Sequence, residues 1–320
     1  MKRRLCHMKG IEQARKFYTE VGIKMIADEF GDYQNRIAVG LVGHGSECFG
    51  FDDEVSRDHD FEVGFCMWLT KEDEEKIGFK LMRAYDKLKE EYCLKNGFGK
   101  PRQSAGGASA QGVYRIDDFY RRYTGCDGAP QTLQDWLYTS SVFFAEATNG
   151  EVFRDDLGEF TKIRNEILHG MPEDVRAKKI GSCALKAAQS GQYNYARCIK
   201  HGEDGAAMLA LCEFVKNACE LAFLLEKKHM PYYKWAFRQM RTLDKFAELS
   251  MPLEFLLTAD NDEKGKELKR EIVEDACGAF AKEINEQFDL GVEGRYLEPF
   301  GYAIQKRIKN AEIRNLHVIL

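Results

Sequence analysis

The stretch GHGSECFGFDDEVSRDHDFEVGF, which runs from Gly43 to Phe65, carries more information about the fold than any other part of the sequence. It begins with two glycines that enclose a histidine, and the second glycine is followed by serine, giving the pair Gly45-Ser46. Glycine lets a backbone approach a bound group closely, and the free N–H groups of such a turn can donate to phosphate oxygens. The stretch therefore predicts a turn that can hold phosphate.

Two carboxylates close the same stretch, in the sequence Asp58-His59-Asp60 at the edge of an apolar run. Side chains alternate along a strand, so Asp58, Asp60 and Glu62 are expected to point to one face. Like charges so close together repel one another in a dry site. A divalent cation removes this repulsion, and Mg²⁺ is usually held by one or two carboxylates together with substrate phosphates. The pattern therefore predicts an Mg²⁺ site beside the phosphate-binding turn.

The sequence around this stretch predicts a unit of mixed α and β structure. The apolar runs RIAVGLVG (36–43) and DFEVGFCMWLT (60–70) are typical of buried strands. Apolar residues near a 3.6-residue period indicate helices over residues 10–30 and 71–92. A Gly- and Ser-rich connector then precedes VYRIDDFY (113–120), which is expected to be another short strand.

Strand patterns nearly disappear after residue 158, and helical periodicity dominates the rest of the chain. The expected helices cover residues 160–169, 172–189, 204–229, 231–246, 263–288 and 299–310. We therefore expect an α+β protein with a mixed-sheet core over residues 1–158 and an all-helical bundle domain over residues 159–320.

The overall composition is that of a folded soluble protein. The chain has 320 residues, of which 44% are hydrophobic, and a formal net charge of −5. This charge argues against a chain-wide nucleic-acid or anionic-membrane surface, but it leaves room for a local basic patch. Ten scattered cysteines without a C-x-x-C pair indicate a reduced, cytoplasmic protein. We expect no signal peptide and no membrane span.

An apolar strand followed by Gly-Ser and, after eleven intervening residues, by Asp-x-Asp resembles the nucleotidyltransferase superfamily, which includes the kanamycin and lincosamide nucleotidyltransferases. Four blocks together resemble an uncharacterised family of nucleotidyltransferase-like proteins with a catalytic core and a helical C-terminal domain: GHGSECFGFDDEVSRDHDF, FYRRYTG, ATNGEVFRDDLGEF and PYYKW. The resemblance spans most of the chain and implies a nucleotidyltransferase fold for the core.

The resemblance also implies roles for individual residues. Gly45 and Ser46 would hold the triphosphate of an NTP, and Asp58 and Asp60 would bind Mg²⁺ and take part in catalysis. Independently of the resemblance, the position of Arg57 directly before Asp58 suggests a contact with a phosphate oxygen, and an ion pair with Asp52, Asp53 or Glu54 is an equal alternative.

A third carboxylate is normally added from a later strand in active members of the superfamily, where it serves as general base. Asp117 in VYRIDDFY is the first candidate for this role, and Asp118 is the next. Glu62 on the earlier strand is the remaining alternative. Loss of this carboxylate would leave a protein that only binds nucleotide.

Lys234 is a candidate for a further phosphate contact. It lies in the block PYYKW, just after Pro231, a residue favoured in the first turn of a helix. In the antibiotic-modifying enzymes a helical domain closes over the core and lends a basic residue to the phosphates. The resemblance implies this role for Lys234, and an exposed lysine beside a core tryptophan is the alternative.

Together, these features predict an Mg²⁺-dependent nucleotidyltransferase that moves a nucleoside monophosphate from an NTP to an acceptor hydroxyl and releases pyrophosphate. A small-molecule acceptor is favoured, without a membrane or nucleic-acid partner. The alternatives are a catalytically inactive NTP-binding regulatory protein and an enzyme that modifies a protein or tRNA, although the acidic balance counts weakly against tRNA.

Overall fold

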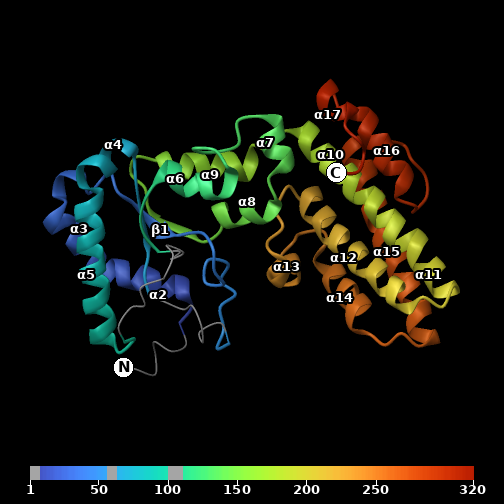
Figure 1. Cartoon of the computed structure of the whole chain (residues 1–320), viewed down its shortest axis with the longest axis horizontal. Coiled ribbons are helices and arrows are strands. Elements are labelled where there is room, and N and C mark those ends of the chain that lie inside the picture. The colour runs from blue at the N-terminus through green and yellow to red at the C-terminus, as the bar shows by residue number, and fades with distance from the viewer. Residues whose placement is uncertain (1–7, 56–62, 100–110) are drawn as a thin grey trace. The chain divides into compact units, whose positions relative to one another are not determined.

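The computed structural model describes residues 8–55, 63–99 and 111–320. The chain forms two compact units (Figure 1), of which the first comprises the residues as far as 131 together with 143–170, and the second comprises 132–142 and 171–320. The first unit contains a mixed sheet and the second is built from helices. The predicted α+β class, with a mixed-sheet core followed by a helical bundle, is therefore confirmed.

Four short strands form the sheet of the first unit: β1 (Ala38–Leu41), β2 (Cys66–Leu69), β3 (Gly112–Arg115) and β4 (Glu151–Arg154). Their order is β3-β2-β1-β4, in which β2 and β3 are parallel and the other two pairs are antiparallel. Every residue of β1 and β2 is buried. The two predicted apolar strands therefore lie at the centre of the sheet, where both faces are covered.

Helices cover the two faces of this sheet. Val39, Leu41 and Met67 point to the face that shares a core with helices from the first ninety-six residues. Trp68 points to the other face, where its ring stacks on Phe160 at 3.9 Å between centroids. The helical elements of the unit are α2 (Gly10–Phe17), a π-helical turn (Tyr18–Gly22), α3 (Ile23–Glu29), a 3-10 turn (Gly31–Tyr33), α4 (Lys71–Asp73), a π-helical turn (Glu74–Gly78), α5 (Phe79–Asn96), α6 (Ile116–Thr124), most of α8 (Ser141–Thr148) and α9 (Glu159–His169).

The prediction of a strand over residues 113–120 is wrong beyond Arg115, where β3 ends and α6 begins. Ile116, Phe119 and Tyr120 are buried at helical spacing. Asp117 and Asp118 lie in the first turn of α6, a position where acidic side chains interact favourably with the helix dipole. The sequence of residues 116–120 is therefore better suited to a helix than to a strand.

The first unit extends past residue 158, where we expected the core to end. Helix α9 belongs to it because Phe160 and Ile167 are buried there, with Phe160 against Trp68. In the other direction, residues 132–142 with α7 (Leu133–Tyr138) belong to the second unit.

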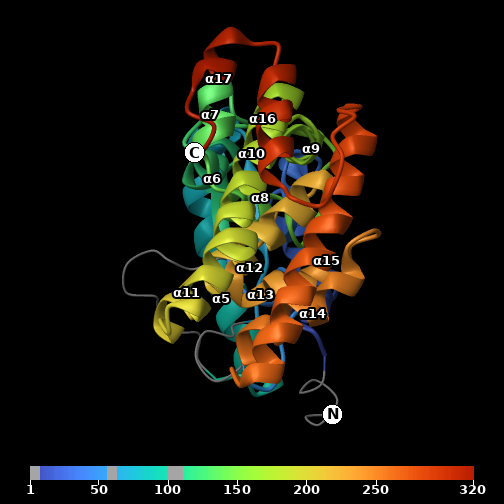
Figure 2. The ribbon, with the colours of Figure 1, turned by 90° about the vertical axis from the view of Figure 1, so that its right-hand side faces the viewer.

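Every residue of the second unit is described, and all of its regular structure is helical. Helix α12 is its central element and packs against α10, α13, α14 and α15 (Figure 2). The elements are α10 (Glu173–Ala187), a π-helical segment (Ala188–Tyr195), α11 (Ala196–Lys200), α12 (Asp204–Leu225), α13 (Tyr233–Met240), a 3-10 turn (Ala247–Leu249), α14 (Ser250–Thr258), α15 (Glu263–Phe288), α16 (Glu298–Arg307) and α17 (Ala311–Asn315).

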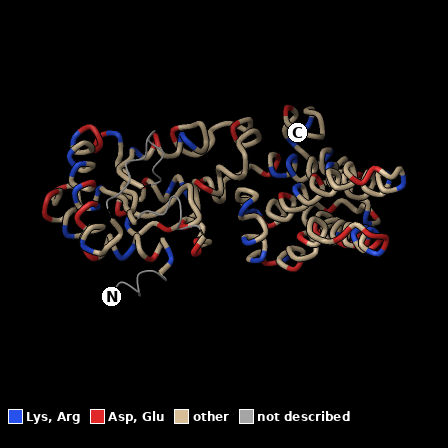
Figure 3. The backbone as a smooth tube through the Cα atoms, turned by 60° about the horizontal axis from the view of Figure 1, so that its bottom comes forward, with Lys and Arg blue, Asp and Glu red and all other residues tan. Residues whose placement is uncertain are grey.

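Charged residues of both signs are interspersed along the helices of each unit (Figure 3). Over the described ranges, none of the helices combines the length and the apolar character needed to cross a membrane. The nine cysteines within those ranges are free thiols.

Candidate functional site

The turn from Gly43 to Ser46 follows directly on β1. Both glycines of this turn have a φ of 125°, a region in which residues with a side chain are strained. A Cβ atom at Gly43 would lie 2.7 Å from the hydroxyl oxygen of Tyr123, and one at Gly45 would lie 2.7 Å from the Glu47 carboxylate. The backbone conformation therefore favours glycine at both positions, and the Tyr123 hydroxyl leaves little room for a side chain at Gly43.

Asn149 fixes the beginning of the turn. Its Oδ1 accepts a hydrogen bond from the Gly43 amide at 2.8 Å, and its Nδ2 donates to the Gly43 carbonyl at 2.7 Å. The Nη2 of Arg164 in turn donates to the carbonyl of Thr148 at 2.6 Å. The turn is thus held by a side chain 106 positions away in sequence.

Glu47 places a negative charge inside the turn. Its carboxylate lies against Gly45 and forms hydrogen bonds with its own backbone amide and with the Ser46 side chain. Burial raises the pKa of the Glu47 carboxyl, and these hydrogen bonds partly offset the increase. The Ser46 side chain and the Glu47 amide can therefore donate hydrogen bonds to an anionic group, and here they donate to the Glu47 carboxylate.

An imidazole and a second carboxylate lie beside the same turn. The Nδ1 of His44 is 3.1 Å from Oε1 of Glu146, with the His44 side chain 82% exposed and that of Glu146 11% exposed. Tyr123 is hydrogen-bonded to the backbone of His44, and burial raises the pKa of its phenol. A solvent-facing acid–base group backed by a nearly buried carboxylate thus adjoins Gly45 and Ser46.

The loop that continues from the turn is tied to the first helix. Asp52 is buried, and its Oδ2 accepts a hydrogen bond from the Gly10 amide at the start of α2 at 2.9 Å. Lys9 also donates to the Asp52 carbonyl. The loop is therefore held at its beginning by Asn149 and near its described end by α2.

Four predicted site residues, Arg57, Asp58, Asp60 and Glu62, lie outside the described residues, so their roles stay predictions. The antiparallel register pairs Gly40 with Cys66, and the end of β1 and the beginning of β2 therefore lie at one edge of the sheet. Within the described part of the chain, no three His, Cys, Asp or Glu side chains are grouped so that they could hold a metal ion.

Asp117 lies near the opposite edge of the sheet. The parallel register pairs Leu69 with Arg115, so β3 ends at the edge where β1 begins, roughly 10 Å along the strands from the Gly40–Cys66 pair. Burial acts to raise the pKa of the Asp117 carboxyl, but hydrogen bonds from Arg115 and the Asp118 amide outweigh it and lower the pKa. Its role as general base stays a prediction, for which a lowered pKa is unfavourable.

Lys234 lies in the first turn of α13 in the second unit, three residues after Pro231, where the predicted helix begins. Its side chain is exposed, and its Nζ is 4.8 Å from the ring centroid of Trp235. Its predicted contact with a triphosphate stays a prediction.

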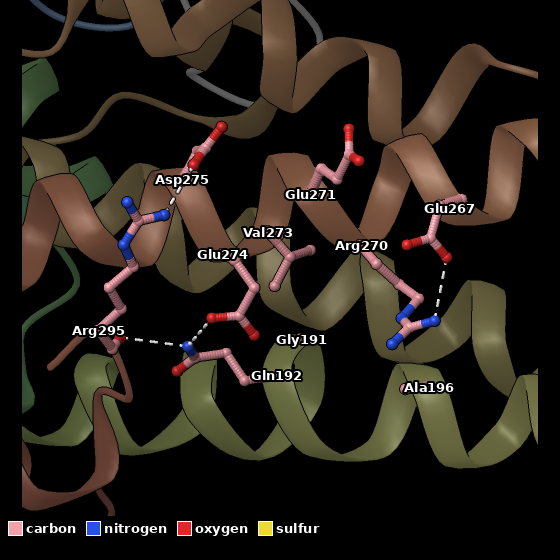
Figure 4. Close-up of a pocket in the computed structure, with 10 residues that line it drawn as sticks. All are labelled: Gly191, Gln192, Ala196, Glu267, Arg270, Glu271, Val273, Glu274, Asp275 and Arg295. Atoms are coloured by element: carbon pink, nitrogen blue, oxygen red, sulfur yellow. Dashed lines mark hydrogen bonds and ion pairs between the residues drawn. The ribbon is translucent and has the colours of Figure 1, made fainter.

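A separate pocket of about 430 Å³ lies in the second unit (Figure 4). Its polar side chains largely satisfy one another: Arg295 forms an ion pair with Asp275 and Arg270 with Glu267, and Gln192 donates a hydrogen bond to Glu274. Carboxylates outnumber guanidinium groups in its lining, so the pocket does not suit a phosphate. The residues that line it are Gly191, Gln192, Ala196, Glu267, Arg270, Glu271, Val273, Glu274, Asp275 and Arg295.

Asn149, Glu146 and Tyr123 belong to the site but were not predicted from the sequence. Two of them lie within blocks that carry the resemblance, Tyr123 in FYRRYTG and Asn149 in ATNGEVFRDDLGEF. The signal was therefore present, but nothing in the sequence indicates that these blocks meet at Gly43. Contacts over such separations depend on the pairing of β1 with β4.

Replacing Asn149 should loosen the turn measurably. Asn149→Ala leaves the buried N–H and C=O of Gly43 without partners, which should cost about 1 to 3 kcal/mol of unfolding free energy and raise hydrogen exchange in peptides covering β1 and the turn. Asn149→Asp keeps an oxygen that accepts from the Gly43 amide, so it should lower the free energy of unfolding by less than Asn149→Ala does. The matched control Asn96→Ala, which removes a single bond at the end of α5, should change stability far less. Equal losses for Asn96→Ala and Asn149→Ala would contradict this role.

Comparisons with known proteins find a family model and a solved structure to which this chain is similar. A family model described as a domain of unknown function (DUF4037) matches residues 136–236, about a third of the chain. No curated protein matches the sequence. Among solved structures, the chain is similar to the crystal structure of a nucleotidyltransferase-like protein from Exiguobacterium sibiricum 255-15, with 13% identity, 90% of each chain covered and a TM-score of 0.35. A TM-score this low carries no argument about fold or function.

Proposed function

We propose that this protein is an Mg²⁺-dependent nucleotidyltransferase that transfers a nucleoside monophosphate from an NTP to an acceptor hydroxyl. The observation that supports this most lies at the Gly45-Ser46 turn, where the Ser46 side chain and the Glu47 amide form hydrogen bonds with the Glu47 carboxylate. A phosphate oxygen offers the same negative acceptor, so the triphosphate would take the place of this carboxylate.

In this proposal, some residues of the 43–65 stretch bind the phosphates of the NTP and others bind the metal ion. Gly45 and Ser46 would position the β- and γ-phosphates, and Arg57 would contact a further phosphate oxygen. Asp58 and Asp60 would hold Mg²⁺, and the bound ion would supply positive charge to the triphosphate and to the leaving pyrophosphate.

The acceptor hydroxyl must lose a proton as its oxygen bonds to the α-phosphorus and the bond to pyrophosphate breaks. The sequence favours Asp117 as the group that takes this proton. The pair of His44 and Glu146 is an alternative at the turn itself, because a carboxylate that accepts from one ring nitrogen stabilises the imidazolium formed when the other takes up a proton.

A regulatory protein that binds NTP without turnover is the second candidate function. The position of Asp117 favours it, since this carboxylate pairs with Arg115 near the sheet edge opposite the Gly43–Ser46 turn. Both functions share the same triphosphate site, so binding alone cannot separate them. The acceptor of an active enzyme would be a small molecule, with a protein or tRNA as the other possibilities.

Ser46→Ala tests the triphosphate site. Loss of a hydrogen bond to a charged phosphate should weaken NTP and NDP binding by about 1.5 to 3 kcal/mol and leave nucleoside binding unchanged. Glu47→Gln should act in the opposite direction, because it removes the negative charge that occupies the turn. Calorimetric titration with each of the four NTPs in the presence of Mg²⁺ measures both effects.

Two outcomes would reject this site. One is equal weakening of nucleoside and triphosphate by Ser46→Ala, and the other is an absence of binding by all four NTPs. If binding is found, incubation of the protein with the best NTP and a metabolite extract, followed by mass spectrometry, would identify an acceptor as a product heavier by one nucleoside monophosphate.

A further inference from the structure

Residues 227–243 combine basic and aromatic side chains without any acid. The segment KKHMPYYKWAFRQMRTL contains five Lys and Arg residues and no Asp or Glu, whereas acids outnumber bases in the whole chain by 52 to 47. Tyr232 is 44% exposed and Tyr233 is 73% exposed, with their ring centroids 4.2 Å apart. We use the name α13 patch for the side chains of Tyr232, Tyr233, Lys234, Trp235 and Arg238.

The patch lies on the outer side of α13. Ala236 and Met240 are the buried residues of this helix, and they face the interior of the second unit, where α13 packs against α12 and α14. Lys234 and Arg238 are one turn apart, so they share a face. Both cations approach the Trp235 ring, with Lys234 Nζ at 4.8 Å and Arg238 Cζ at 5.9 Å from its centroid.

Lys234 gives the patch a positive charge that no carboxylate in the described ranges neutralises. Lys228 is neutralised by Glu226 and Asp244, and Arg241 pairs with Glu254. Lys234, in contrast, forms no ion pair with any residue in the described ranges, and its Nζ lies over the Trp235 ring. An anionic partner would therefore meet a cation that is not already neutralised by a carboxylate of the chain.

We infer that the α13 patch binds single-stranded nucleic acid, with bases stacked on Tyr233 and Trp235 and phosphates held by Lys234 and Arg238. Exposed aromatic rings between basic side chains are the two elements that sequence-tolerant single-strand binding requires. An anionic membrane fits less well, because the apolar side chains Ala236 and Met240 are buried and leave no apolar face to insert. The net charge of −5 does not oppose the inference, since a local patch determines local binding.

The inference does not rest on the proposed nucleotidyl transfer. Binding should need neither Mg²⁺ nor NTP, and it should persist in a variant without the predicted metal ligands, such as Asp58→Asn. Failure of one proposal is therefore distinguishable from failure of the other.

Tryptophan fluorescence offers a local readout. Of the three tryptophans, Trp68 and Trp136 are 0% and 5% exposed, whereas Trp235 is partly exposed in the patch. Titration of the full chain with an oligouridylate of about twelve nucleotides, a length within the usual single-strand site sizes, should quench the emission of Trp235. Trp235→Phe should abolish the quenching while anisotropy of a labelled oligonucleotide still reports binding.

Variants separate stacking from charge. Tyr233→Ala should weaken oligonucleotide binding by about tenfold, the scale of one lost base stack. The double variant Lys234→Ala/Arg238→Ala should weaken it similarly and make the salt slope of log K shallower by about 1.4, or 0.7 for each phosphate contact. The matched control is Tyr193→Ala, which removes a 50% exposed tyrosine that also carries an arginine, Arg197, over its ring. It should leave affinity within about twofold.

Several results would overturn the inference. One is an equal effect of Tyr193→Ala and Tyr233→Ala, and another is binding of heparin as tight as that of the oligonucleotide, which would show that charge alone acts. Binding of a mononucleotide as tight as that of the oligonucleotide would assign the patch to a single nucleotide. Quenching of Trp235 by phosphatidylserine vesicles, with none by oligonucleotide, would assign it to a membrane.

Discussion

Asp58→Asn and Asp60→Asn should each abolish Mg²⁺-dependent NTP binding while the protein stays folded. Each change removes a charge that we predict to bind the metal directly. Loss of residues that only support a metal ligand already costs 10- to 100-fold in affinity, so loss of a ligand should cost at least about 100-fold. Calorimetry in Mg²⁺ and again in EDTA measures the effect, because EDTA should reduce wild-type binding to the level of the variants.

The matched control is Glu54→Gln. It removes one negative charge from an exposed carboxylate of the same loop, four residues before Asp58. If a general change in charge were responsible, this variant would reproduce the effect of the other two. Unchanged Mg²⁺-dependent affinity in both aspartate variants would disprove the predicted metal site.

Glu146→Gln and Asp117→Asn should have very different effects on turnover if the acid–base group lies at the turn. Glu146→Gln keeps the shape of the side chain but removes the charge that faces His44, so turnover should fall by about 100-fold or more, with NTP affinity within a few-fold. His44→Ala should cause a similar loss, and the double variant should lose little more, because residues that act as a unit are not additive.

The pH profile of turnover distinguishes this role from a structural one. The acidic limb should vanish in His44→Ala and move to lower pH in Glu146→Gln, since the carboxylate favours the protonated imidazole. A large loss of turnover in Asp117→Asn, together with unchanged turnover in Glu146→Gln, would identify Asp117 as the general base. NTP binding without turnover in the wild-type protein would favour the regulatory function.

Segments with one clear local pattern were predicted well from the sequence. Helix α15 has the predicted bounds of 263 and 288, because Asp262 caps its first turn and a long apolar stripe continues through it. The strand before the Gly43–Ser46 turn was also found, since an apolar β-branched run bounded by glycine has few other interpretations.

Features that depend on distant contacts were not predicted. Residues 116–120 have a pattern compatible with strand or helix, and burial of Phe119 and Tyr120 on one side decides for α6. Strand β4 was missed because four residues, Glu151–Arg154, give little signal until β1 is beside them. The contacts of Asn149 and Glu146 with the turn depend on the same pairing.

The division of the chain into units has a consequence for any attempt to separate them. The chain passes from one unit to the other three times, after residues 131, 142 and 170. A fragment that stops at 131 would lack β4 and Asn149, and the open edge of β1 would invite pairing with other molecules. Isolating the sheet unit therefore requires residues 143–170 to be kept together with the residues up to 131.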